Sequence, residues 1–320
     1  MRIAALDFGS NTFLCLIADI TEQGQLNVIK DLVEIVRLGQ GVAQSGRFSE
    51  ESLARATTCL QRFSKEIQNL KPDLILGVAT AAARSVSNSY ELINICKEMN
   101  IPIEIISGDR EAELTFAGAL SSLNNKTTQT QSDTLNSQHL VIDIGGGSTE
   151  IILGTSKELK FKKSFNIGVV KLKEKYISEY PISNEVQDLI QNEIDNTFAE
   201  INSADFPKNI AITAVAGTPT SLAAAVIGNF NYEKIDGFIF TKSQLMNWKS
   251  NLSNLTPELI EKKYSIPKGR SDVLAVGVMI LIGALVSLNA QQLQVSTRGL
   301  RFGLLFDIWN KNKHLIFQKG

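Results

Sequence analysis

Two short segments of the chain place an aspartate just before a glycine turn that carries hydroxyl side chains. Glycines let backbone N–H groups approach phosphate oxygens, because no Cβ blocks the way and the N–H dipoles converge on an anion. An aspartate at the end of a strand suits Mg²⁺, which binds carboxylate and water together with substrate phosphate oxygens. The candidates are Asp7, Ser10 and Asn11 in DFGSNT, and Asp143, Gly145, Gly146, Gly147, Ser148 and Thr149 in DIGGGST. Ordinary hairpin turns would use the same residues for geometry alone, but two turns in matching contexts favour ligand binding.

A third candidate element is AVAGTPTSLAAA, in which a strand breaks at Gly217. We expect Thr218 to cap the following helix and Pro219 to take its first position. A helix N-terminus attracts anions, which makes Gly217 and Thr218 candidate phosphate-binding residues. The same signature also begins many helices that bind nothing.

Hydrolysis further needs a group that deprotonates or orients water and cations that offset phosphoryl charge. Glu111, in ISGDREAEL at the junction of a strand and a helix, is the candidate base. The alternative is an acidic residue that only favours the first helical turn. Arg84, Arg298 and Arg301 follow strands and could bind phosphate with two N–H groups each, or serve as surface or packing arginines.

Several chemistries are excluded or disfavoured. The P-loop pattern G-x-x-x-x-G-K-[ST] does not occur, and the two histidines, His139 and His314, stand apart from any Ser or Cys motif. That argues against Ser-His-Asp catalysis and against a multi-histidine zinc site. The net charge of −1 gives no global basic surface for duplex nucleic acid.

The composition is that of a soluble globular protein, with 43% hydrophobic and 20% charged residues, and 320 residues suffice for two domains. The three cysteines are odd in number and lie among apolar neighbours, which indicates buried thiols in a reducing compartment. The N-terminus leads directly into a strand pattern without a signal peptide, so the expected location is cytoplasmic. The uncharged run 273–288 is too short for a membrane span and is expected to be a buried helix.

Hydrophobic periodicity predicts an α/β fold in each half. In the first half we expect a hairpin over residues 2–20, a third strand within 26–38, a helix capped by Ser49 over 50–70, and then strands and helices over 74–79, 90–99, 103–107 and 110–123. In the second half we expect a hairpin over 139–154, a strand over 160–169, helices over 174–180 and 184–201, a strand over 209–216, a helix from 218, a helix after 272, a strand over 292–297 and a helix over 300–309.

The polar segment 124–138 predicts a flexible loop and a domain boundary. Residues 139–154 then repeat the pattern at the start of the chain, which is an apolar strand, an acidic residue, a glycine turn with hydroxyl side chains and a second apolar strand. The two halves are therefore interpreted as distant copies of each other. We expect one domain over residues 1–123, a second over 124–299, and a C-terminal helix over 300–320 that returns to the first domain.

With these motifs in place, the chain resembles the exopolyphosphatase/guanosine pentaphosphate phosphohydrolase family in its short two-domain form. The resemblance rests on DFGSNT, ATAAAR, ISGDREA, VIDIGGGSTE, FNIGVVKL, AVAGTPTSLAA, GRSDVLAVG and VSTRGLRFG, in the family's order. It implies two ribonuclease H-like domains of the actin-like ATPase superfamily flanking a cleft. It also implies Mg²⁺-assisted water attack, with Mn²⁺ as the alternative ion, on the end of polyphosphate or of pppGpp, the latter linked to the stringent response.

The resemblance also assigns roles to particular residues. Glu111 matches the catalytic glutamate, Arg84 the phosphate-binding arginine, and Asp143 and Glu150 the acids that hold metal and orient water. Thr297 stands where the family usually has an acid before Arg298, which leaves open a different partner for the arginine or a different handling of metal.

Two other functions use the same turns. One is an ATP-dependent small-molecule kinase, although Glu150 and Glu111 favour water over an alcohol acceptor; the other is an actin-like, nucleotide-switched scaffold. The preference between polyphosphate and pppGpp, the chain-length preference and the oligomeric state, a homodimer among the options, stay open.

Overall fold

The computed structural model describes residues 1–123, 137–208 and 210–317, and these form two compact units. The first unit combines Met1–Ser121 with Gly299–Gly320, and the second spans Ser122–Arg298. The predicted flexible loop lies almost wholly outside the described residues.

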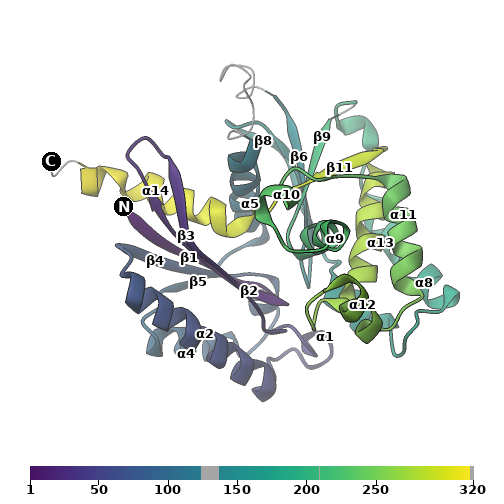
Figure 1. Ribbon diagram of the computed structural model, residues 1–320, viewed down its shortest axis with the longest axis horizontal. Helices are drawn as coiled ribbons and strands as arrows, with labels where there is room; N and C mark the ends of the chain where they lie inside the picture. The colour runs from purple at the N-terminus through teal and green to yellow at the C-terminus, as the bar shows by residue number, and fades with distance from the viewer. Residues whose placement is uncertain (124–136, 209, 318–320) are drawn as a thin grey trace. The chain divides into compact units, whose positions relative to one another are not determined.

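The first unit is built on a five-stranded sheet in the order β3-β2-β1-β4-β5 (Figure 1). Strands β1, β2 and β3 are antiparallel, whereas β1, β4 and β5 run parallel. The strands are β1 (Arg2–Phe8), β2 (Thr12–Ile20), β3 (Leu26–Ile35), β4 (Leu74–Ala79) and β5 (Ile103–Ile105). The helices are α1 (Val42–Ser45), α2 (Glu50–Leu70), α3 (Ala81–Arg84), α4 (Ser89–Glu98), α5 (Gly108–Leu123) and α14 (Leu300–Phe317).

Both faces of this sheet are covered, because successive side chains of a strand point to opposite faces. Leu6 of β1 packs in a core with Leu60 of α2 and Leu92 of α4. Ala5, its neighbour, packs in a second core with Leu114 of α5 and Leu305 of α14. The C-terminal helix therefore belongs to the core of the first unit.

The second unit is built on a six-stranded sheet in the order β10-β11-β9-β6-β7-β8 (Figure 1). Strands β6, β9 and β11 are parallel to one another, and the outer pairs are antiparallel. The strands are β6 (His139–Ile144), β7 (Thr149–Gly154), β8 (Leu159–Phe165), β9 (Ala211–Val215), β10 (Ile239–Thr241) and β11 (Gln292–Val295). The helices are α7 (Val169–Tyr176), α8 (Asn184–Phe198), α9 (Gly217–Ile227), α10 (Tyr232–Ile235), α11 (Lys242–Ser253), α12 (Pro257–Tyr264) and α13 (Ser271–Ser287), with a 3₁₀ turn at Ser203–Asp205.

Helix α13 forms the centre of the second core, as the uncharged run predicts. It packs against α8 and α11, and its residues from Val273 to Leu285 are buried. Within the described residues, no helix combines the length and hydropathy that crossing a bilayer requires.

Several predictions made from periodicity are confirmed. The N-terminal hairpin and β4 have the expected bounds, and the Ser49 side chain accepts a hydrogen bond from the Ser52 N–H at the start of α2. The three cysteines are buried and unpaired, and burial raises the pKa of each thiol to about 12.

Other predicted bounds are wrong. The segment 160–169 stays extended only to Phe165, and the next helix begins at Val169 rather than 174, because Gly168 turns the chain against the glycine turn described below. The final helix continues to Phe317 instead of ending at residue 309. Thr218 does not cap α9: Ala216, with φ 73°, precedes the helix, and Thr218 and Pro219 follow Gly217 inside it.

Candidate active site

In the second unit, three loops with predicted site residues follow three neighbouring parallel strands. The glycine turn follows β6, the start of α9 follows β9, and residues 296–298 follow β11. The register pairs Asp143 with Val215 and Ala214 with Val295, so the three strands end at the same edge of the sheet. The carboxyl edge of parallel strands is the place where α/β sheets bind ligands. The fold thus brings together residues that are far apart in the sequence.

The glycine turn after β6 is held from behind by the start of α7. Its own closure is a hydrogen bond of 2.9 Å from the Gly145 N–H to the Ser148 carbonyl. The Val169 and Val170 amides donate to the carbonyls of Gly145 and Gly146, at 3.1 and 2.9 Å. In a trans peptide the C=O and the next N–H point in opposite directions, so the Gly146 and Gly147 amides face away from α7. Among the described hydrogen bonds, none uses the amides of residues 146–148 as donors, which suits an anion site.

Gly168 makes this arrangement possible. A Cβ at residue 168 would lie 2.6 Å from the Gly146 carbonyl carbon and oxygen and 2.6 Å from the Gly147 nitrogen. The next support is the Thr149 hydroxyl, which donates to the Ile167 carbonyl at 2.7 Å. The glycine turn therefore packs against the segment 165–170, and these contacts fix its backbone conformation.

The two candidate metal-binding carboxylates stand opposite each other on neighbouring strands. Asp143 of β6 pairs in register with Glu150 of β7, and Glu150 pairs with Ser164 of β8. Directly opposite residues share a face of the sheet, with Cβ atoms about 5 Å apart. Glu150 is 1% exposed, and the Ser164 hydroxyl donates to its Oε1 at 2.6 Å. The three side chains form a row that begins next to the glycine turn.

This carboxylate pair fits a divalent ion of the magnesium type. No cluster of three or more His, Cys, Asp or Glu side chains able to hold a metal occurs in the described residues. Mg²⁺ does not need one, because it keeps several waters and is bound by one or two carboxylates plus substrate phosphates. Zinc, which takes three or four protein ligands, fits less well.

An arginine that the sequence reasoning missed lies at the N-terminus of α9. A Cβ at Gly217 would lie 3.2 Å from Arg270 Cζ and Nη1, and the Arg270 Nη1 donates to the Ser221 hydroxyl at 3.0 Å. The guanidinium therefore reinforces the anion-binding end of the helix. The motif GRSDVLAVG contained the signal, since a glycine and an arginine precede a helix there. Thr218 packs instead toward α13, where a Cβ on Gly277 would meet its hydroxyl at 2.3 Å.

Arg298 and Arg301 have different environments, although both follow β11. Arg298 is half-buried, and burial lowers its pKa while the negative charge of Asp236 acts in the opposite direction. Arg301 lies on α14 and forms a two-point ion pair with Asp31 of β3, at 2.9 and 2.8 Å, with both side chains buried. This ion pair favours the alternative interpretation of Arg301, that of a packing arginine, over that of a phosphate clamp.

In the first unit, predicted site residues again follow the carboxyl ends of adjacent parallel strands. Asp7 is near the end of β1, Arg84 ends α3 after β4, and Glu111 lies in the first turn of α5 after β5. An Arg84 Nη1 group donates to Glu111 Oε2 at 2.8 Å and to the Ile106 carbonyl at 2.9 Å. Glu111 is 8% exposed, and burial raises its pKa although Arg84 opposes that shift.

The turn after β1 follows the same plan as the glycine turn. The Gly9 N–H donates to the Thr12 carbonyl at 3.1 Å. The Asn11 carbonyl accepts from the amides of Val36 and Arg37, and the Ser10 carbonyl accepts from the Gly39 amide at 2.8 Å. Both turns are thus fixed through their carbonyls by a following segment.

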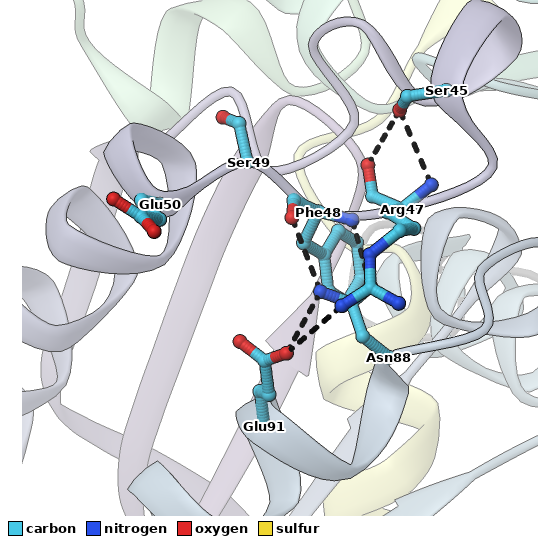
Figure 2. A pocket seen from close by; sticks show the side chains of 7 residues that line it. All are labelled: Ser45, Arg47, Phe48, Ser49, Glu50, Asn88 and Glu91. Atoms are coloured by element: carbon cyan, nitrogen blue, oxygen red, sulfur yellow. Dashed lines mark hydrogen bonds and ion pairs between the residues drawn. The ribbon is translucent and has the colours of Figure 1, made fainter.

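A pocket of about 370 Å³ also lies in the first unit, but none of the predicted site residues lines it (Figure 2). The buried Asn88 side chain exchanges hydrogen bonds with both backbone groups of Phe48, and Glu91 contacts Asn88 and Arg47. These contacts connect the start of α2 to the start of α4 and suffice to explain the polar groups there.

Comparison with known families matches residues 16–312 to the Ppx/GppA phosphatase family. The chain belongs to this family. Membership confirms the resemblance, the fold of two actin-like, ribonuclease H-like domains, and the predicted enzyme class, a phosphoanhydride hydrolase. Divalent-metal dependence is general among Ppx/GppA phosphatases, in agreement with the carboxylate pair.

Relatives and solved structures match most of the chain. It is 30% identical to exopolyphosphatase 2 of Mycobacterium tuberculosis over 302 residues, which cover 88% of each protein. It is 31% identical to a bifunctional 3-dehydroquinate synthase/phosphatase of Fusobacterium nucleatum, but spans only 42% of that protein. An exopolyphosphatase structure from Cytophaga hutchinsonii matches with a TM-score of 0.85 at 26% identity, covering 97% of this chain and 98% of that one. The Aquifex aeolicus Ppx/GppA family member matches with a TM-score of 0.79 at 26% identity, covering 98% and 99%.

Proposed function

We propose that the protein is an exopolyphosphatase that releases terminal orthophosphate from inorganic polyphosphate. The observation that carries the proposal is the carboxyl edge of β6, β9 and β11, where the turn with the amides of residues 146–148 connects the strands that carry Asp143 and Glu150. Backbone donors bind phosphate oxygens, and carboxylates bind a divalent ion that phosphate shares. Exopolyphosphatases among the matched proteins, such as those of Mycobacterium tuberculosis and Cytophaga hutchinsonii, support the choice of substrate.

Phosphate binding is assigned to groups on both units. In the second unit these are the amides and hydroxyls of residues 145–149, the N-terminal amides of α9 at Gly217 and Thr218, Arg270 beside them, and Arg298. In the first unit they are Ser10, Asn11 and Arg84. Arginines and helix N-termini stabilise negative charge that spreads over the phosphoryl oxygens during transfer.

Glu111 is assigned the role of general base for the attacking water. Burial raises the pKa of its carboxyl, which makes the carboxylate a better proton acceptor, while the Arg84 guanidinium keeps the ionised form accessible. The same guanidinium can turn to a phosphate when a chain arrives, and Glu111 is then released to orient water.

Asp143 and Glu150 would hold Mg²⁺, or Mn²⁺ as an alternative, and Asp7 is a further candidate ligand. When bound, the ion offsets negative charge on the phosphate oxygens. Ser164 keeps the Glu150 carboxylate oriented at its buried position, so this ligand is preorganised before an ion binds.

The proposed groups contact phosphates only, which extends the proposal to pppGpp as a second substrate that would yield ppGpp. That reaction would connect the protein to the stringent response. A homodimer and a cytoplasmic location stay predictions.

The proposal is tested with purified protein, Mg²⁺ and polyphosphate in the absence of ATP, with released orthophosphate measured by malachite green. Steady orthophosphate release is expected, and parallel reactions with pppGpp compare the two substrates. ATP-dependent phosphorylation of a small-molecule acceptor without polyphosphate hydrolysis would instead identify a kinase. Nucleotide-dependent polymers without turnover, seen by sedimentation, would identify a scaffold.

A further inference from the structure

Arg298 follows a tight turn that is bound by a carboxylate from a distant part of the second unit. The Thr297 N–H donates to Asp236 Oδ1 at 3.1 Å, across 61 residues of sequence, and the Thr297 hydroxyl lies 3.5 Å from the same oxygen. The Arg298 N–H donates to the Ser296 hydroxyl at 3.1 Å, and Ser296 is 2% exposed. The backbone ahead of Arg298 is therefore fixed by side chains on both sides.

Asp236 is itself held firmly. It follows the fully buried Ile235 at the end of α10, and the Gly237 N–H donates to the Val295 carbonyl at 2.8 Å. The Val295 N–H in turn donates to the Phe238 carbonyl at 2.7 Å. The loop that carries the carboxylate is thus paired with the end of β11, immediately before the turn.

The charge of Asp236 also acts on the arginine. Arg298 is half-buried, and the nearby carboxylate offsets part of the pKa lowering that burial causes. A guanidinium partly withdrawn from water is stable only with such compensation.

We propose that Asp236 is a positioning residue for Arg298: its carboxylate fixes the turn at Thr297, from which the Arg298 side chain extends toward phosphate at the carboxyl edge of β6, β9 and β11. This inference rests on the proposed function, in which Arg298 binds the substrate. It also resolves the question that Thr297 raises, because an acid near Arg298 is present but comes from residue 236 instead of 297.

Positioning and plain electrostatics predict opposite effects of removing the Asp236 charge. If Asp236 only weakened the field of Arg298, Asp236→Asn would strengthen phosphate binding. If Asp236 positions Arg298, the same substitution weakens binding. The neutral amide oxygen of asparagine is a weaker acceptor for the Thr297 N–H than the carboxylate, so the turn that places Arg298 is held less firmly.

The test compares wild type with the single variants Asp236→Asn and Arg298→Ala. It also includes two double variants, in which Asp236→Asn is combined with Arg298→Ala or with Thr297→Asp. Binding of fluorescently labelled polyphosphate, phosphate release and thermal melting are measured for each. We expect Asp236→Asn to raise Kd and KM about three- to tenfold, the scale of replacing a charged hydrogen-bond acceptor by a neutral one, with kcat changed less than about twofold. Thr297→Asp should restore most of the affinity, and Asp236→Asn should have no further effect in the Arg298→Ala background.

Unchanged or tighter binding by Asp236→Asn, or an equal loss with and without Arg298, would overturn the inference. If Asp236→Asn does not fold, Asp236→Glu takes its place, because it displaces the carboxylate by one methylene. Asp236→Glu should then raise KM, and an unchanged KM would overturn the inference. Wild type that binds polyphosphate without releasing phosphate would refute the proposed function alone, because the binding series still decides on Asp236. Wild type that binds none would refute both.

Discussion

The carboxylate of Glu111 accepts a hydrogen bond of 2.8 Å from the guanidinium of Arg84, and the glutamate residue as a whole is 8% exposed. Burial favours the protonated acid and Arg84 favours the carboxylate, so the pair balances two opposing effects on one pKa. The pKa of Glu111 therefore lies above its ordinary value, and Arg84 limits this rise until phosphate competes for the arginine.

Glu111→Gln should lower kcat by at least about a hundredfold, the scale of losing a general base, while melting temperature changes little. Glutamine keeps the size of the side chain and an oxygen for Arg84, so the surrounding contacts persist. Phosphate release and thermal melting measure the two quantities. Turnover near that of wild type would place the base elsewhere.

Arg84→Ala should raise KM for polyphosphate and move the acidic limb of the pH–rate profile to higher pH. Arg84 lowers the pKa of Glu111, so its removal leaves burial unopposed and the pKa rises further. A higher pKa means that the active carboxylate forms only at higher pH. Arg84→Lys is the matched control, because it keeps the positive charge and should leave the acidic limb close to its wild-type pH. An acidic limb that does not move in Arg84→Ala would contradict the effect of Arg84 on the pKa of Glu111.

Gly168→Ala should abolish most activity and lower the melting temperature. The added methyl would lie 2.6 Å from backbone atoms of Gly146 and Gly147, and backbone cannot move aside as a flexible side chain does. Asn166→Ala changes an exposed residue of the same segment and serves as control, with activity near wild type expected. Normal phosphate release by Gly168→Ala would show that the glycine turn does not need its close contact with residue 168.

Ser164→Ala should raise the Mg²⁺ concentration needed for half-maximal activity, about tenfold, the lower end for loss of a residue that orients a metal ligand. Ser164→Thr keeps a hydroxyl and should raise it less. The measurement is a Mg²⁺ titration of phosphate release at saturating polyphosphate. Identical titration curves for wild type and Ser164→Ala would remove Ser164 from the support of Glu150.

The sequence predicts the local elements of this fold well because their signals are local. The spacing of Leu53, Ala56 and Leu60 gives α2 its buried face, and Asp143 and Gly145 mark the end of β6 and its turn. By contrast, α7 begins five residues before its predicted start, because the steric demand at Gly168 comes from residues 146 and 147.

Contacts between residues far apart in the sequence decide the roles that sequence reasoning left open or missed. Arg301 meets Asp31, which lies 270 residues away, and no local pattern distinguishes it from Arg298. Arg270 reaches Gly217 and Ser221 from the start of α13, and Ser164 reaches Glu150 across a strand pair. Such contacts depend on strand order and register, which hydrophobic periodicity does not encode.

The most direct test of hydrolysis by activated water is to run the reaction on polyphosphate in ¹⁸O-labelled water and analyse the orthophosphate by mass spectrometry. Each orthophosphate should carry one solvent oxygen, and Glu111→Gln should form this product at no more than about a hundredth of the wild-type rate. Orthophosphate without solvent oxygen, or an unchanged rate of labelling in Glu111→Gln, would contradict the mechanism.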